Sequence, residues 1–222
     1  MDAVIVDWMR SPFHRAHKGG LKEVRPDEMA GQVARALLAR NNIPAKQIDD
    51  LLLGCAYPEG EQGYNVARLV SFLSGLPDTV PGATFNRLCG SSMEAIHVAV
   101  GKISTGSGNC FLVGGMESMS RVKRRGFNWS PHPGLEDSFP EAYINMGITA
   151  ENVADKYSIN RIRQEEFALS SHQKSHFARL EGNFAYEICP IVHGEKSIDS
   201  DGCIRPSSNL ESMAGLNPVF KE

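Results

Sequence analysis

The sequence predicts an α/β fold: a layered α/β/α half with a mixed, mostly parallel sheet, followed by a helical and irregular loop domain. Two observations predict it. Short apolar runs alternate with helical segments up to residue 117, which is typical of βα units. Beyond that point the alternation stops, and a stretch with several prolines and no clear period follows. We therefore expect two domains, residues 1–117 and 118–222.

The strands of the first domain are predicted from four short runs with strand character, most of them apolar throughout. Each run has the length of a buried strand and is too short for a helix. The predicted strands are residues 3–6, 51–55, 83–88 and 110–114.

Three helices are predicted between these strands. The first begins at Pro26, which suits the first helical position, and ends before Pro44. The second covers about 64–74. The third follows Cys89, carries an apolar face of methionine, isoleucine and valine, and ends at Gly106.

The second domain is predicted to hold two helices and no strand. One helix is expected to be capped by Thr149, and the other to span about 161–181 before Gly182. Residues 190–222 have the composition of a loop. A long segment of this kind after a regular βα half is typical of an insertion that covers a site.

Composition and charge argue against some classes of protein function. Lysine plus arginine number 23 and aspartate plus glutamate 26, so the net charge of −3 argues against a nucleic-acid binder with a basic surface. No apolar run reaches the length of a membrane span. The first residues, with an acid at position 2 and a short apolar run, do not resemble a signal peptide. We therefore expect a cytoplasmic protein.

The cysteines and histidines predict no metal site. The chain has five cysteines, an odd number with no CxxC pair, which disfavours a disulfide framework or a zinc site. His172 and His176 have helical i, i+4 spacing, but no third ligand accompanies them. A solvated helix face is the favoured interpretation of that pair.

Cys89 is the main candidate for chemistry. It lies where the third predicted strand ends and a helix begins, and ligands of such sheets gather at the carboxyl ends of the strands. The positive end of a helix favours the thiolate, which is the nucleophilic form, and its N–H groups can hold an oxyanion. A buried cysteine before a glycine turn is the alternative, and from these residues alone both remain open.

The segment NRLCGSSMEAIHVA around Cys89 resembles the nucleophilic-cysteine signature of the thiolases, in particular the degradative 3-ketoacyl-CoA thiolases (acetyl-CoA acyltransferases). Other stretches agree with the same family in order and spacing, so the resemblance covers all 222 residues. These stretches are VDWMRSPFHRAHKGGLKEVRPDEMA, LLLGCAYPEGEQGYNVAR, FLVGGMESMS and MGITAENVADKYSINRIRQEEFALSSHQKS.

The resemblance implies a function and a set of site residues. Cys89 would attack the keto carbon of a 3-ketoacyl-CoA and keep the acyl group as a thioester, which a second CoA removes. CoA and acyl-CoA are then substrates, no cofactor is tightly bound, and the process served is fatty acid β-oxidation. Along the CoA, the resemblance places Met146 at the pantetheine, Arg205 at the nucleotide end, and Ser212, Leu216 and Phe220 beside the same ligand.

Three segments that the family carries in its second half are absent from this sequence: Asn-Glu-Ala-Phe, Gly-His-Pro and Cys-x-Gly. By resemblance they hold the histidine that deprotonates the nucleophile and a second cysteine that handles a proton. We therefore expect that this chain alone does not complete turnover, and that its sheet lacks a strand. The family also implies a homodimer or higher oligomer, and a multifunctional β-oxidation subunit as a possible partner.

Two other functions remain open from the sequence. Condensing enzymes such as ketoacyl synthases share the fold and the cysteine, although their loop region resembles this one little. The other function is non-catalytic: the chain would be a truncated thiolase that binds CoA or a protein partner, and Cys89 would be vestigial.

Overall fold

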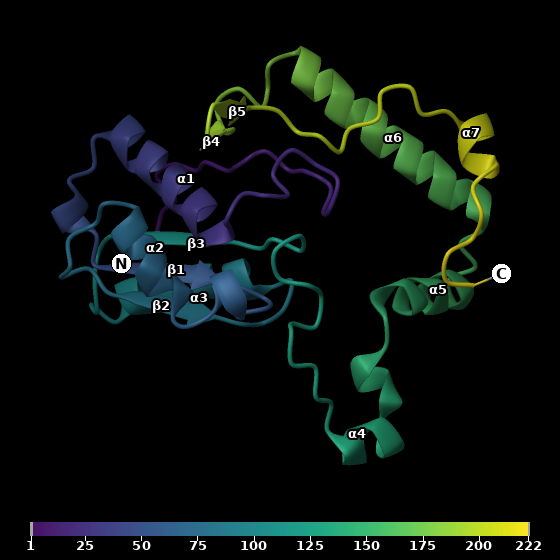
Figure 1. Ribbon diagram of the computed structural model, residues 1–222, viewed down its shortest axis with the longest axis horizontal. Helices are drawn as coiled ribbons and strands as arrows, with labels where there is room; N and C mark the ends of the chain where they lie inside the picture. The colour runs from purple at the N-terminus through teal and green to yellow at the C-terminus, as the bar shows by residue number, and fades with distance from the viewer. Residues whose placement is uncertain (1, 222) are drawn as a thin grey trace. The chain divides into compact units, whose positions relative to one another are not determined.

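The computed structural model describes residues 2–221, which divide into two compact units. Unit 1 runs from the N-terminus to Asn128 and includes Tyr186–Cys203, while unit 2 consists of Trp129–Ala185 and the stretch from Ile204 onward (Figure 1). The elements of unit 1 are α1 (Pro26–Asn41), β1 (Asp50–Gly54), α2 (Val66–Leu73), β2 (Gly82–Phe85), α3 (Ser91–Ser104), β3 (Phe111–Gly115), β4 (Ile191–His193) and β5 (Lys196–Ile198). Those of unit 2 are α4 (Pro133–Ser138), α5 (Met146–Lys156), α6 (Arg161–Leu180) and α7 (Leu210–Ala214). Short 3-10 turns cover Ala45–Gln47, Gly60–Gln62 and Pro140–Tyr143.

The central sheet of unit 1 is parallel and has the strand order β2-β1-β3. Leu52 in the middle strand is in register with Ala83 on one side and Val113 on the other. This confirms the predicted α/β class and three of the four predicted strands. A separate antiparallel pair, β4 and β5, also belongs to unit 1.

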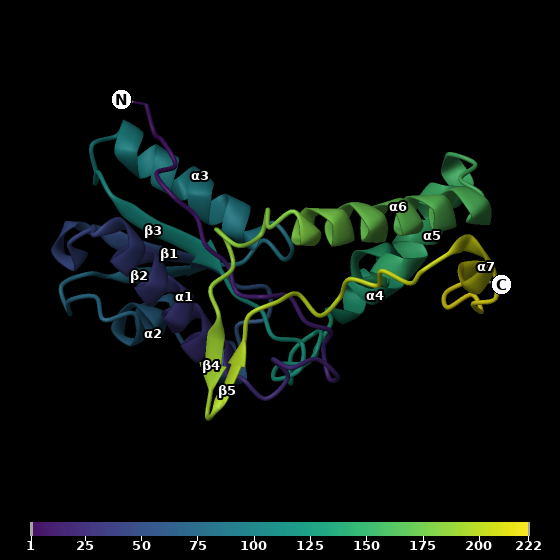
Figure 2. The ribbon, with the colours of Figure 1, turned by 90° about the horizontal axis from the view of Figure 1, so that it is seen from above.

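Helices cover both faces of the sheet, with α1 and α2 on one side and α3 on the other (Figure 2). Because side chains alternate along a strand, Leu51 and Leu53 pack into the core on the α2 side, with Val66 and Val70. Leu52 points the other way, into the core against α3. The predicted layered arrangement follows from this alternation.

The helices of unit 1 begin and end where local chemistry predicts. Pro26 is at the first position of α1, with Asp27 and Glu28 near the positive end of its dipole. Asn42, with φ +51°, takes the left-handed conformation that ends the helix. The predictions of α1, α2 and α3 are confirmed to within a few residues.

The predicted strand at residues 3–6 is wrong. These residues have no regular structure, and Val4, Ile5 and Val6 are 78%, 74% and 74% exposed. An extended segment becomes a strand only when a neighbour accepts and donates its backbone hydrogen bonds. Within residues 2–221, no segment pairs with it in this way.

Two expectations for the later part of the chain also need correction. Residues 190–222 hold the β4–β5 hairpin and α7, not only loop. Helix α5 begins at Met146, earlier than predicted, because Asn145 and not Thr149 is its cap: the Asn145 side chain accepts a 2.9 Å hydrogen bond from the Gly147 N–H.

Among residues 2–221, no helix has both the length and the apolar character that a membrane span requires.

The structure divides the chain differently from the predicted boundary after residue 117. Residues up to Asn128 stay with unit 1 because Arg121 forms an ion pair with Glu61, and the Phe127 N–H donates to Glu59. The segment Tyr186–Cys203 returns to unit 1 as well. Contacts between residues far apart in the sequence, which leave no periodic pattern, hold both segments in unit 1.

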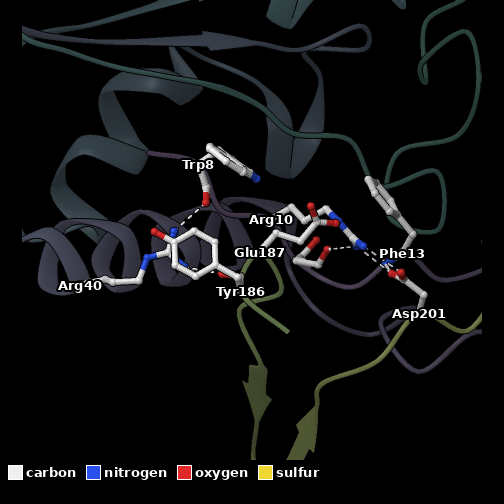
Figure 3. Close-up of polar contacts among 8 residues, drawn as sticks. Trp8, Arg10, Phe13, Arg40, Tyr186, Glu187 and Asp201 are labelled. Atoms are coloured by element: carbon white, nitrogen blue, oxygen red, sulfur yellow. Dashed lines mark hydrogen bonds and ion pairs between the residues drawn. The ribbon is translucent and has the colours of Figure 1, made fainter. Parts of the chain in front are cut away.

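Two arginines hold the returning segment against the N-terminal part of unit 1 (Figure 3). Arg10 donates to Asp201 at 2.8 and 2.9 Å and to Glu187 at 2.7 Å, so one guanidinium binds both ends of the segment. Arg40 lies over the Tyr186 ring, 4.1 Å from its centroid, and pairs with Asp7. The fully buried Ile191 adds an apolar contact with Leu21 and Val24, so charge-assisted bonds and core packing together fix the returning segment.

The carboxylates that pair with Arg10 and Arg40 lose their charge in acid, so we expect the returning segment Tyr186–Cys203 to loosen at low pH. Hydrogen bonding from Asn41 lowers the pKa of Asp7 from 3.8 to about 2, against an opposing effect of burial and with further help from Arg40. A carboxyl whose folded pKa is depressed stabilises the fold fully above its ordinary pKa and loses that contribution as the pH falls toward the folded value. We expect the contacts of Asp7 to be lost between about pH 4 and pH 2.

Trp8 reports this change, because its ring meets that of Tyr186 edge-on at 6.0 Å. In a Trp129→Phe background, Trp8 fluorescence should change over that pH range and return on neutralisation. Asp7→Asn should remove this transition, whereas Asp78→Asn, at an exposed carboxyl, should keep it. An unchanged acid transition in Asp7→Asn would contradict the assignment of this transition to the Asp7 carboxyl.

Candidate active site

Cys89 lies in a tight turn between β2 and α3, and its side chain is exposed. Asn86 shapes the start of the turn: its side chain accepts a 2.9 Å hydrogen bond from the Leu88 N–H and donates one of 3.1 Å to the Ala56 carbonyl. Leu88 has a φ of +47°, in the left-handed region. The alternative of a cysteine buried before a glycine turn is therefore excluded.

Cys89 directly precedes the first turn of α3, where some backbone N–H groups have no partner. Those of Gly90 and Ser91 donate to the carbonyls of Arg87 and Leu88 at 3.0 and 3.1 Å. In the described part of the chain, the N–H groups of Ser92 and Met93 make no hydrogen bond. Together with the helix dipole, such free N–H groups favour negative charge at this position, on the sulfur or on a nearby oxygen.

A buried polar cluster braces the carboxyl ends of β1 and β3. Gln62 is fully buried, and its side chain donates to Glu117 at 2.5 Å and accepts from the Ser118 N–H at 2.6 Å. The Glu117 carboxylate also accepts a 2.7 Å hydrogen bond from the Ala56 N–H. Glu117 thus braces the glycine turn after β3. Gln62 was missed, because nothing in its local sequence signals a buried polar partner.

Three other cysteines are unsuited to nucleophilic attack. Burial, helped by the negative charge of Glu117, raises the pKa of Cys55 to about 11. Burial also raises the pKa values of Cys110 and Cys189 above their ordinary range. These thiols are kept protonated, whereas Cys203 is exposed like Cys89 but does not begin a helix.

Two of the predicted CoA residues meet within unit 2. Met146 is the first residue of α5 and is 59% exposed. The ring of Phe220 lies against Gly147, so closely that a Cβ on that glycine would overlap the ring. The C-terminal segment therefore covers the start of α5 beside Met146, an adjacency that the sequence separation conceals.

The other three predicted CoA residues lie around α7. Ser212 completes a capping box: its N–H donates to the Asn209 side chain at 2.8 Å, and its hydroxyl accepts from the Asn209 N–H at 3.4 Å. Leu216 is 59% exposed, and its carbonyl accepts a 3.0 Å hydrogen bond from Arg161. Arg205 is exposed, and its backbone N–H donates to His172 at 3.2 Å.

Sequence reasoning missed Arg161, which orders the segment after α7 through the carbonyls of Met213 and Leu216. His172, which the sequence suggested only as a weak metal candidate, is a hydrogen-bond acceptor for the Arg205 backbone. Among residues 2–221, no group of three or more metal-ligating side chains gathers. Cys89 belongs to unit 1 and the five predicted CoA residues to unit 2.

Comparison with known proteins identifies the family. A family model described as "Thiolase, N-terminal domain" matches residues 3–222. The chain is 41% identical over 225 residues to a 3-ketoacyl-CoA thiolase of Shewanella frigidimarina (strain NCIMB 400), covering 98% of this chain and 58% of that protein. Similar values hold for proteins of the same name from Shewanella loihica (strain ATCC BAA-1088 / PV-4), with 42% identity, and Serratia proteamaculans (strain 568), with 41%.

The chain spans 58% of the length of these relatives. The match covers the βα half, the Cys89 turn and unit 2 in one continuous alignment of nearly the whole chain. The α/β architecture with its parallel sheet agrees with this assignment. The chain belongs to the thiolase family, as an N-terminal thiolase domain.

Proposed function

We propose that this chain carries the acyl-accepting cysteine of a thiolase-type acyl transfer, with Cys89 as the residue that is acylated. The observation that supports this most is the position of the thiol: it is exposed, at the start of α3 and at the carboxyl end of a parallel sheet. Relatives that match 98% of the chain bear the name 3-ketoacyl-CoA thiolase. We extend that activity to this chain as part of the proposal.

The proposed reaction has two transfers. The Cys89 thiolate attacks the keto carbon of a 3-ketoacyl-CoA, the bond between its second and third carbons breaks, and acetyl-CoA leaves after taking up a proton. The shortened acyl group remains on the sulfur as a thioester. The thiol of a second CoA then loses its proton and attacks the thioester carbonyl, which releases acyl-CoA and restores the thiolate. N–H groups at the start of α3 would stabilise each oxyanion.

We assign CoA binding to Met146, Arg205, Ser212, Leu216 and Phe220 in unit 2. The exposed apolar surfaces of Met146 and Phe220 would contact the pantetheine region. The Arg205 guanidinium suits a phosphate or a planar base, and in the described part of the chain it makes no hydrogen bond. The Ser212 hydroxyl already serves the α7 cap, so only its remaining lone pair would face a ligand. CoA and acyl-CoA act as substrates here, and no tightly bound cofactor is part of the proposal.

Turnover needs a base that this chain does not supply. The sequence contains none of the three family segments that hold the basic histidine and the second cysteine. We propose that the 222-residue chain by itself accepts an acyl group slowly and does not complete the cycle. A role in fatty acid β-oxidation, a cytoplasmic location and a multifunctional β-oxidation partner belong to the same proposal.

Exposed apolar side chains support association into a dimer or higher oligomer. On α3, Met93, Ile96 and Val100 are 62%, 41% and 42% exposed, although helix surfaces of monomers are mostly polar. We expect the chain to sediment as more than a monomer at micromolar concentration, and Ile96→Lys to shift it toward the monomer. Ile162→Lys, at an exposed isoleucine of α6 and outside this patch, is the matched control and should leave the sedimentation unchanged. A wild-type chain that sediments as a monomer would count against association.

Incubation with acetyl-CoA, followed by intact-mass spectrometry and peptide mapping, tests the proposed chemistry. We expect one acetyl group, in place of one hydrogen, on Cys89 and not on Cys203. No adduct while CoA still binds would favour a CoA-binding protein without catalysis. Adduct formation on both exposed cysteines at equal rates would show unspecific chemistry and refute the proposal.

A further inference from the structure

The backbone at Leu88 is held in an unfavourable conformation directly before the candidate nucleophile. Its φ of +47° lies in the left-handed region, which a residue with a Cβ seldom occupies. The Leu88 side chain is 59% exposed, so its own packing does not impose this conformation. Some other group must stabilise the turn that presents Cys89.

The Asn86 side chain accepts from the Leu88 N–H, and the second such group is Ser91. It is 4% exposed, and its hydroxyl accepts a 2.9 Å hydrogen bond from the Arg87 N–H while donating one of 2.5 Å to the Leu88 carbonyl. One buried hydroxyl therefore spans the turn from its beginning to the peptide group that joins Leu88 to Cys89. In the described residues, no side chain caps α3 in the usual way, so this bridge takes the place of a cap.

Two glycines let the first turn of α3 approach the sheet. Gly54 and Gly115 end β1 and β3 and are in register with each other. A Cβ on Gly54 would lie 2.8 Å from the Cβ of Ser91, and one on Gly115 would lie 2.8 Å from the Cβ of Ser92. Both distances are too short for a real contact, so the helix start rests directly on backbone and has little freedom to shift.

We propose that Ser91 is a positioning residue for Cys89. Its hydroxyl holds Leu88 in the left-handed conformation, and the Gly54–Gly115 floor fixes the first turn of α3, so that the sulfur stays beside the free N–H groups of the helix. The inference rests on the proposed function only for the use made of the thiol. The geometric claim concerns the thiol itself and needs no CoA.

The rate of Cys89 alkylation by iodoacetamide tests this claim. The full chain carries Cys203→Ser, so that the other exposed thiol does not react, and peptide mapping confirms the site. We expect Ser91→Ala to lower the second-order rate constant about fivefold, because the thiolate loses its fixed place at the helix end. Ser104→Ala is the matched control: this exposed serine lies at the other end of α3, where its hydroxyl donates to the Val100 carbonyl, and the rate should not change. Equal rates in the two variants would overturn the proposal.

Leu88→Gly separates positioning from a general loss of structure. Glycine adopts a positive φ without a Cβ penalty, so the turn then needs the Ser91 hydroxyl less. In that background we expect Ser91→Ala to change the alkylation rate by less than about twofold. If Ser91→Ala lowers the alkylation rate as much in the Leu88→Gly background as in the chain that keeps Leu88, then Ser91 only stabilises the fold. If Ser91→Ala alone does not fold, the comparison of Leu88→Gly with the double variant decides in the same way.

A failure of the positioning role of Ser91 and a failure of the proposed function give different experimental results. Acetylation of the wild-type chain by acetyl-CoA tests the proposed function. The ratios of the alkylation rates among the variants test whether Ser91 positions Cys89. A chain that is never acetylated but shows the fivefold ratio would keep the positioning role of Ser91 without thiolase chemistry. A chain that is acetylated with equal alkylation rates would show the reverse.

Discussion

Replacing Cys89 with serine is expected to abolish acetylation of the chain by acetyl-CoA, with a rate at least about a hundredfold lower. A serine hydroxyl is almost wholly protonated at neutral pH and is a far weaker nucleophile than a thiolate. Intact-mass spectrometry over a time course measures the acetylated fraction.

Cys203→Ser is the matched control for this substitution, since Cys203 is the other exposed cysteine of the described residues. Its acetylation should match that of the wild-type chain. Circular dichroism should show that both variants are folded, because neither position is in the core. An acetylated Cys89→Ser chain would place the acceptor elsewhere, and the exposed thiol of Cys203 would be the first position to map.

Leu52→Ala is expected to lower the free energy of unfolding by about 2 to 5 kcal/mol. Leu52 is fully buried in the middle strand of the sheet, where it packs against Ala95 and Ala99 of α3. Truncation leaves a cavity that two small alanines cannot fill, so the lost transfer energy and the cavity both contribute. Urea denaturation of the full chain, followed by circular dichroism, measures the change.

Ile5→Ala provides the comparison, because both positions were predicted as strand from the same kind of apolar run. Ile5 is 74% exposed, so its truncation should change the free energy of unfolding by less than about 0.5 kcal/mol. Equal losses at Leu52 and Ile5 would mean that the segment 3–6 is packed in solution. The experiment thus also checks the corrected description of the N-terminal segment.

The sequence was sufficient for features that local chemistry determines. Pro26 with its acidic first turn defined the start of α1, and the alternation of apolar runs with helical periods defined a parallel βα unit. The position of Cys89 at a strand-to-helix junction was also predictable, because both flanking elements have strong local signals. These features depend on residues within one or two turns of each other.

The sequence was insufficient where residues far apart must meet. The run at residues 3–6 has the composition of a strand, but a strand also requires a paired neighbour, which local composition does not report. The return of Tyr186–Cys203 to unit 1 depends on Arg10 and Arg40. The hairpin within that segment is short and exposed, with little of the alternation that identifies longer strands.

For the candidate site, the sequence by itself determined which thiol lies at the start of a helix, and its resemblance to a family indicated which residues would meet CoA. Only the tertiary structure decided that the thiol is exposed, that Gln62 and Glu117 brace the strand ends behind it, and that Ser91 bridges the strained turn. The physical reason is that hydrogen bonds across a turn and close approach over Gly54 depend on distances in space. Residue types and their periodicity specify the elements, while packing specifies the geometry between them.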